Sequence, residues 1–151
     1  MLRSGLKLPR PYRDPELYKT VLETGFSVFP QRRENYMKYE TSKRDATVGH
    51  LPVRLDVENV SRCNFHCTMC VVSDWPKLKR ADDMSFGDYK ALIDEQYGLV
   101  EIKLQGLGEP LMGECYFDMI EYARKKHIWV RSTTNASLLH LNDNYKRLID
   151  S

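Results

Sequence analysis

Residues 53–70 have the sequence VRLDVENVSRCNFHCTMC, and this stretch decides the fold that we expect. In its first half, apolar residues alternate with charged ones, and a period of two residues indicates a β-strand with one apolar and one polar face. In its second half, Cys63, Cys67 and Cys70 lie within eight residues. The stretch therefore predicts a strand that leads directly into a cysteine-rich loop.

Strands and helices are predicted to alternate downstream of this loop. Strand periodicity recurs over residues 100–105 and 128–133, and helical periodicity over residues 85–97, over 114–126 and from Asn142 onward. Ser85 with Asp88 three residues later is typical of a capping box, and Gly98 is typical of a helix stop. This alternation indicates parallel β/α units.

The predicted strands keep one polar face, whereas strands covered by helices on both sides are nearly continuous apolar runs. The polar residues at alternate positions are Arg54, Asp56, Glu58, Glu101, Lys103, Gln105, Arg131, Thr133 and Asn135. A barrel whose lumen holds a polar ligand explains them. The alternatives are an exposed sheet and an ion network that only stabilises the fold. Because three parallel strands do not close a barrel, we expect a truncated chain that is not self-sufficient as a catalyst.

Residues 1–50 are expected to form a helical N-terminal extension, followed by one domain over residues 51–151. Asp14 before Pro15 is typical of a helix start, and Gly25 is expected to end that helix. A second helix is expected around Gln31–Lys43.

Composition excludes several classes of protein. The 151 residues carry 23 Lys+Arg and 21 Asp+Glu, and a net charge of +2 is too weak to indicate a nucleic-acid partner. The sequence has neither an apolar run of roughly 18 residues, as a membrane span requires, nor the apolar segment of a secretory signal. We therefore expect a cytoplasmic protein with no nucleic-acid or membrane partner.

The cysteine spacing indicates a metal or iron–sulfur site, since a disulfide framework would spread its cysteines along the chain. A C-x3-C-x2-C loop can hold three corners of a cubic iron–sulfur cluster and leave the fourth iron open, as a catalytic metal site requires. Structural zinc, with His66 or a distant residue as fourth ligand, is the alternative. Cys115 stands apart in an expected outer helix, and we expect it to be a packed, inert thiol.

Two further segments lie at strand ends, where ligand sites of parallel α/β folds gather. Gly106-Leu-Gly-Glu-Pro110 follows the second strand, and Thr133-Thr-Asn135 lies at the end of the third. Together with the cysteine triplet, they resemble the radical S-adenosylmethionine (radical SAM) enzymes over roughly residues 52–151. The chain is most similar to members with a C-terminal, cysteine-rich SPASM domain. The resemblance implies the N-terminal portion of a partial (β/α)6 TIM-like barrel, with about three β/α units present.

The resemblance also implies an enzyme activity. A 4Fe–4S cluster on Cys63, Cys67 and Cys70 would bind S-adenosylmethionine at its open iron and cleave it reductively to a 5′-deoxyadenosyl radical. That radical would abstract hydrogen from a substrate, either a peptide or a sugar or other small metabolite. The electron would come from an external donor such as a flavodoxin or ferredoxin. No catalytic residue is expected beyond the cluster, and the alternative is a non-catalytic iron–sulfur or zinc-binding interaction fragment.

The same resemblance implies a set of residues around S-adenosylmethionine. They are Met69, Gly106, Gly108, Glu109, Pro110, Thr133 and Asn135. Glycines let a backbone approach a ligand closely, and a carboxylate such as Glu109 can accept hydrogen bonds from an ammonium group. On this view, Gly108→Val should weaken cofactor binding and leave the iron content unchanged.

Overall fold

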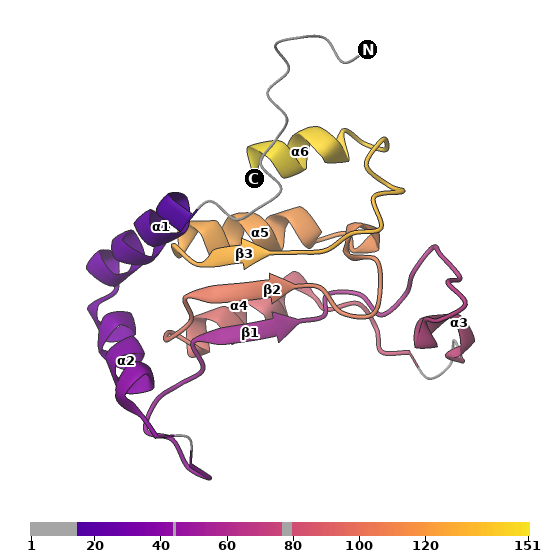
Figure 1. Cartoon of the computed structure of the whole chain (residues 1–151). Coiled ribbons are helices and arrows are strands. Elements are labelled where there is room, and N and C mark those ends of the chain that lie inside the picture. Colours follow the sequence, from indigo (N-terminus) through magenta and orange to yellow (C-terminus); the bar gives the residue numbers. More distant parts are fainter. Residues whose placement is uncertain (1–14, 44, 77–79) are drawn as a thin grey trace, which may run out of the picture.

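The computed structural model describes residues 15–43, 45–76 and 80–151, so the expected cap at Asp14 lies outside the described residues. Its centre is a parallel three-stranded sheet in the order β1-β2-β3 (Figure 1). The strands are β1 (Arg54–Val57), β2 (Glu101–Leu104) and β3 (Trp129–Arg131). The prediction of parallel strands that alternate with helices is confirmed.

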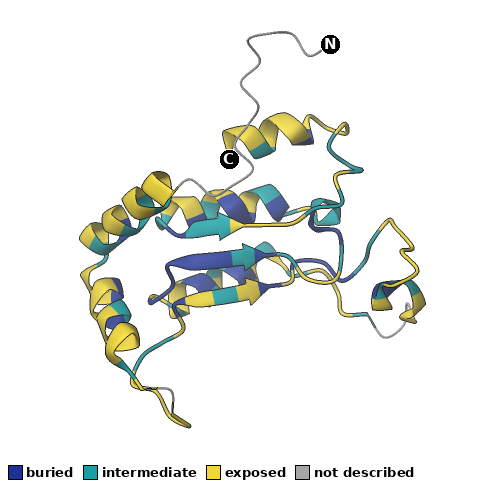
Figure 2. Cartoon of the chain, viewed as in Figure 1, coloured by how far each residue is buried: buried dark blue, intermediate teal, exposed yellow. Residues whose placement is uncertain are grey.

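Two helices, α4 (Phe86–Glu95) and α5 (Tyr116–Lys125), cover the apolar face of the sheet. Ile102 and Leu104 of β2 are fully buried there and belong to one core with Tyr89 of α4 and Met119 of α5. Figure 2 shows this core as the dark blue segments of β2 and α5. Each such side chain contributes about 1.5–3 kcal/mol when it leaves water, so this face holds the sheet and the two helices together.

Helix α4 begins at the predicted capping box. The Ser85 hydroxyl oxygen accepts a hydrogen bond from the Asp88 backbone N–H at 3.0 Å, and the hydroxyl donates to the Asp88 carboxylate at 2.7 Å. The helix ends at Glu95, before Gly98. Gly98 lies in the turn that follows, as predicted for a helix stop, and a Cβ there would also overlap the Asn35 side-chain amide.

At its amino end, the polar face of the sheet is an ion network around Glu101. Glu101 is 2% exposed, and its carboxylate pairs with Arg131 at 2.6 Å and with Arg54 at 3.6 Å. The Tyr18 hydroxyl donates to the same carboxylate at 3.1 Å. These charged side chains pair with one another, which agrees with the alternative of an ion network that stabilises the fold. The three strands of the described residues form an open sheet and not a closed barrel.

Helices α1 (Pro15–Val28) and α2 (Pro30–Thr41) lie at the amino ends of the strands (Figure 1). The prediction that α1 ends at Gly25 is wrong, because the helix continues for three more residues. Gly25 is buried, and a Cβ there would lie 2.9 Å from the His127 carbonyl oxygen. The glycine is therefore needed for close packing against the core.

Arg32 of α2 joins these helices to the core. Its guanidinium donates to the Lys126 carbonyl at 2.6 Å, to the His127 carbonyl at 3.2 Å and to the Tyr97 carbonyl at 3.3 Å. These carbonyls follow the C-terminal ends of α4 and α5, so one side chain caps both helices. Burial lowers the pKa of Arg32 to about 10, which leaves the group charged at neutral pH. The domain boundary at residue 50 stays a prediction.

Three short helices complete the described chain. They are α3 (Val71–Asp74), the 3₁₀ helix η2 (Pro110–Met112) and α6 (Asn144–Asp150). The last was expected from Asn142, but Asn142 and Asp143 have φ values of 48° and 55°, in the left-handed region that Asn and Asp tolerate. Within the described residues, no helix is both long enough and apolar enough to cross a membrane.

Candidate cofactor site

The cysteine loop, the turn after β2 and the segment after β3 meet at the carboxyl ends of the strands (Figure 1). The Glu109 backbone N–H donates to the Arg62 carbonyl at 2.9 Å, which joins the turn to the start of the loop. The Asn135 side-chain amide donates to the Cys63 sulfur at 3.7 Å and to the Asn64 side-chain oxygen at 3.0 Å. Segments far apart in the sequence thus form one site.

Local hydrogen bonds shape the cysteine loop. The Cys70 backbone N–H donates to the Cys67 carbonyl at 3.0 Å, and the Ser73 hydroxyl donates to the same carbonyl at 2.9 Å. Val72 of α3 is 2% exposed and anchors the end of the loop in the protein. Between these fixed points, Cys67 is exposed, whereas Cys63 and Cys70 are half-buried.

Three cysteine thiols on one loop are the type of ligand that an iron–sulfur cluster needs. All three thiols are free of disulfides, and the Cys63 sulfur accepts hydrogen bonds from the Phe65 backbone and the Asn135 side chain, contacts that suit a thiolate ligand. In the part of the chain that the structure describes, no group of three or more His, Cys, Asp or Glu side chains is placed to hold a single metal ion. Cys115 packs against the hydrophobic core at the start of α5, as predicted.

At Gly106 and Gly108, other parts of the protein occupy the space that a side chain would need. A Cβ at Gly106 would overlap the Glu58 carboxylate, and one at Gly108 would overlap the Val60 carbonyl. Glu58 accepts hydrogen bonds from the backbone N–H groups of Leu107 at 2.6 Å and Gly108 at 3.4 Å. The glycines therefore let the turn pack against the end of β1 and the entry to the cysteine loop.

Glu109 lies beneath the site, 2% exposed, with both carboxylate oxygens engaged. One oxygen accepts from the Thr134 hydroxyl at 2.6 Å and from the Leu111 backbone N–H at 3.2 Å. The other accepts from the Asn135 backbone N–H at 2.7 Å. Burial raises the pKa of the nearby Tyr116 hydroxyl, and the charge of Glu109 acts in the same direction.

The remaining predicted residues differ in exposure. Met69 is 92% exposed on the cysteine loop, Thr133 is exposed, and Pro110 is buried at the start of η2. It is the hydroxyl of Thr134, and not that of Thr133, that reaches Glu109. The roles of these residues toward a cofactor stay predictions.

Three supporting residues were missed by sequence reasoning. Glu58 holds the glycine turn, the Asn59 side chain donates to the Pro110 carbonyl at 3.0 Å, and Arg62 donates to the Met112 carbonyl at 2.8 Å. Arg62 also pairs with the carboxylate of Asp83. Only Glu58 had a signal in the sequence, since it continues the polar face of β1.

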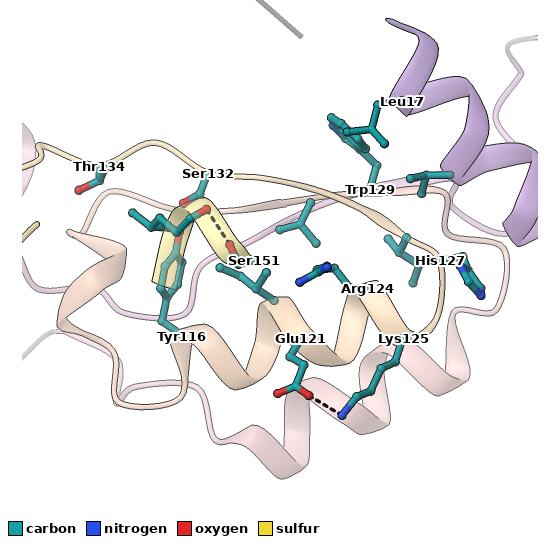
Figure 3. Close-up of a pocket in the computed structure, with 15 residues that line it drawn as sticks. Leu17, Tyr116, Glu121, Arg124, Lys125, His127, Trp129, Ser132, Thr134 and Ser151 are labelled. Carbon is teal, nitrogen blue, oxygen red and sulfur yellow. Dashed lines mark hydrogen bonds and ion pairs between the residues drawn. The ribbon is translucent and has the colours of Figure 1, made fainter. Parts of the chain in front are cut away.

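A cavity of about 880 Å³ lies beside this site, along the edge of β3 that has no neighbouring strand among the described residues. Figure 3 shows Thr134 and Ser132 toward one end and Leu17 and Trp129 toward the other. Its apolar lining comes from α1, α5, β3 and α6. Thr134 lines this cavity and also contacts Glu109 in the candidate site. Because no residue of the cysteine loop lines the cavity, we do not assign the cofactor to the cavity.

Comparisons with known proteins support the fold. No family model matches the sequence. The chain is 30% identical over 88 residues to the tungsten-containing aldehyde ferredoxin oxidoreductase cofactor-modifying protein of Pyrococcus furiosus, a match that covers 56% of this chain and 24% of that protein. The crystal structure of BtrN in complex with AdoMet and 2-DOIA is similar with a TM-score of 0.53 and 22% identity, over 66% of this chain and 42% of that one. The chain therefore shares the fold of part of BtrN and spans about a quarter of the curated relative.

Proposed function

We propose that this chain carries the cluster-binding and cofactor-binding core of a radical SAM enzyme. In this proposal, Cys63, Cys67 and Cys70 bind a 4Fe–4S cluster, and the adjoining strand ends bind S-adenosylmethionine. The observation that carries it is the hydrogen bond from Asn135 to the Cys63 sulfur, which joins the cysteine loop to the end of β3. The match to a cofactor-modifying protein and the fold shared with BtrN, which was solved with AdoMet, support the same conclusion.

When bound, the cluster supplies the electron that splits S-adenosylmethionine and so provides a radical able to take hydrogen from a substrate. The protein holds the cluster and orients S-adenosylmethionine against it. The cysteine loop is fixed at one end by the Arg62 carbonyl and at the other by buried Val72, so its thiols stay at the strand ends. Met69 offers an exposed apolar side chain that can pack against the adenine ring.

The polar face of the sheet suits a polar substrate, either a peptide or a sugar or other small metabolite. Lys103 of β2 stands beside Asp56 of β1 and Arg131 of β3 in the strand register, so charges of both signs are present. An external electron donor such as a flavodoxin or ferredoxin would reduce the cluster. Cys67 is exposed, which supports access of such a donor to the cluster, and free thiols are typical of a reducing compartment, for which we propose the cytoplasm. The likeness to SPASM-type members stays a prediction.

The test is anaerobic reconstitution with iron and sulfide, followed by reduction with dithionite in the presence of S-adenosylmethionine. We expect bound iron and sulfide in equal amounts and formation of 5′-deoxyadenosine, measured by chromatography. Cys67→Ala is the control that should lose both. A colourless wild-type protein that binds zinc and releases no 5′-deoxyadenosine would favour the zinc-binding alternative.

A further inference from the structure

We infer that Lys103 and Arg131, on the polar face of the sheet, bind an anionic group of the substrate, a carboxylate or a phosphate. This inference deepens the proposed function and rests on it, because it names the charge of the molecule on which the cofactor would act. Lys103 lies within β2, whereas the residues of that turn predicted to bind S-adenosylmethionine begin at Gly106, so we assign the anion to the substrate.

The first step is that the carboxylates at the two ends of this face already have partners. At the amino end, the buried Glu101 carboxylate pairs with Arg131 at 2.6 Å and with Arg54 at 3.6 Å. At the carboxyl end, Glu58 accepts hydrogen bonds from two backbone N–H groups of the turn after β2. Both carboxylates are therefore held by other groups of the protein than Lys103.

The second step is that Lys103 has no such partner. Its neighbours in β2, Ile102 and Leu104, are fully buried in the core, so the Lys103 side chain projects from the opposite, polar face. It is half-buried, and among the described residues no hydrogen bond or ion pair engages its ammonium group. Because a partly buried charge is stabilised by a partner of opposite charge, this ammonium is suited to receive an anion from a ligand.

The third step is that a second cation stands beside it. Arg131 of β3 is the register partner of Lys103, and neighbouring strands lie only about 4.7–4.9 Å apart. Like charges at such positions repel each other, and an anion bound between them removes the repulsion. The Arg131 side chain is 49% exposed, and a guanidinium has five N–H donors, so it can hold Glu101 and still donate to a ligand.

The carboxylate of Asp56 gives the inference a test of opposite sign. Asp56 of β1 is the register partner of Lys103 on its other side, it is exposed, and no ion pair joins the two side chains among the described residues. Within the three strands, the polar face carries three cations and two carboxylates, and this balance favours an anion. The charged side chains are Arg54, Lys103, Arg131, Asp56 and Glu101. Removal of the Asp56 charge should therefore strengthen anion binding.

The experiment titrates the whole metal-free chain with inorganic phosphate and, separately, with succinate, at constant ionic strength balanced by chloride. Nuclear magnetic resonance shifts of the backbone amides of β2 and β3 report where each anion binds. Lys103→Met removes the charge at similar length, Lys103→Arg restores a cation, and Asp56→Asn removes the neighbouring carboxylate. Lys38→Met removes a charge from an exposed side chain of α2 and is the control.

We expect wild-type protein to bind these anions at millimolar concentration, with shifts centred on Lys103 and Arg131. Lys103→Met should weaken binding about tenfold, as the loss of a charge-assisted hydrogen bond predicts, and Lys103→Arg should restore most of it. Asp56→Asn should bind more tightly, and Lys38→Met should equal wild type. A preference for phosphate or for succinate identifies the anionic group. Shifts confined to other parts of the chain, or wild-type affinity in Lys103→Met, would overturn the inference.

S-adenosylmethionine also carries a carboxylate, so its affinity for the reconstituted proteins is measured as well. We expect Lys103→Met to leave this affinity and the iron content unchanged, and a tenfold loss of affinity would assign the site to the cofactor and overturn the inference. Wild-type protein that assembles no iron–sulfur cluster contradicts the proposed function. Wild-type protein that assembles the cluster and binds neither anion on the polar face contradicts this inference alone.

Discussion

At the residue scale, the four cysteines divide into two kinds by their surroundings. Cys63, Cys67 and Cys70 lie on one loop at the strand ends, whereas Cys115 packs against the core at the start of α5. Replacing any of the first three with alanine should abolish the cluster, because two thiolates and water cannot hold a cube. Cys115→Ala should keep wild-type iron and sulfide content, and loss of iron from this variant to the same extent would contradict the open-iron arrangement.

Gly108 shows how the structure changes an expectation from the sequence. A Cβ at this position would overlap the Val60 carbonyl and lie 2.6 Å from the Arg62 carbonyl, both in the segment that enters the cysteine loop. Gly108→Ala should therefore reduce cluster content as well as S-adenosylmethionine affinity. The control is Gly87→Ala, whose Cβ would make only an ordinary contact of 3.6 Å with the Ser85 hydroxyl. Wild-type iron content in Gly108→Ala would restore the simpler view that this glycine serves the cofactor alone.

At the element scale, one buried arginine links α2 to the ends of α4 and α5. Arg32 is 4% exposed, and Arg32→Ala would leave the Lys126, His127 and Tyr97 carbonyls without this donor. We expect the free energy of unfolding to fall by about 2–4 kcal/mol, as for other buried hydrogen-bond networks. Denaturant unfolding measures it, with exposed Arg33→Ala as the control. An equal, small effect of both variants would mean that the N-terminal helices do not stabilise the core.

The pairing of α4 with α5 should depend on pH through Asp94. The Lys126 ammonium lies 2.7 Å from the Asp94 carboxylate, and the Tyr122 hydroxyl donates to it. Hydrogen bonds from Lys126 and Tyr122 lower the pKa of Asp94. The group therefore adds stability above its unfolded pKa, and that stability is lost as the pH falls through the folded pKa.

Asp94→Asn should lower the free energy of unfolding at neutral pH by less than about 1 kcal/mol, because the pair is partly exposed. In acid, where wild-type Asp94 is protonated, the two proteins should converge. Unfolding curves at neutral and acidic pH test this, and a difference that grows in acid would contradict the assigned ion pair.

At the scale of the whole molecule, the sequence predicts the features that depend on local periodicity. The strands and the helices α4 and α5 follow from apolar patterns, and the start of α4 follows from the Ser85 capping box. Features that depend on distant neighbours could not be predicted in this way. Gly25 lies inside α1, where it packs closely against the His127 carbonyl. Glu109 is buried, and it accepts a hydrogen bond from the segment after β3.

In the candidate site, too, local sequence patterns could be predicted and long-range contacts could not. The motif segments could be located in the sequence, since parallel strands bring their carboxyl ends to one edge. The hydrogen bond between Asn135 and Cys63 joins residues 72 positions apart, and no local pattern encodes it. The ion network at Glu101 likewise needs Tyr18, which the expected N-terminal extension did not place near the sheet.

The central claim is that the cysteine loop and the neighbouring strand ends bind a cluster and S-adenosylmethionine together. Electron paramagnetic resonance of the reconstituted, reduced protein, recorded with and without S-adenosylmethionine, tests it most directly. We predict the signal of a reduced 4Fe–4S cluster whose g values shift when S-adenosylmethionine is added, because the cofactor binds at the open iron. A cluster signal that S-adenosylmethionine leaves unchanged, or a protein that gives no cluster signal, would contradict the account.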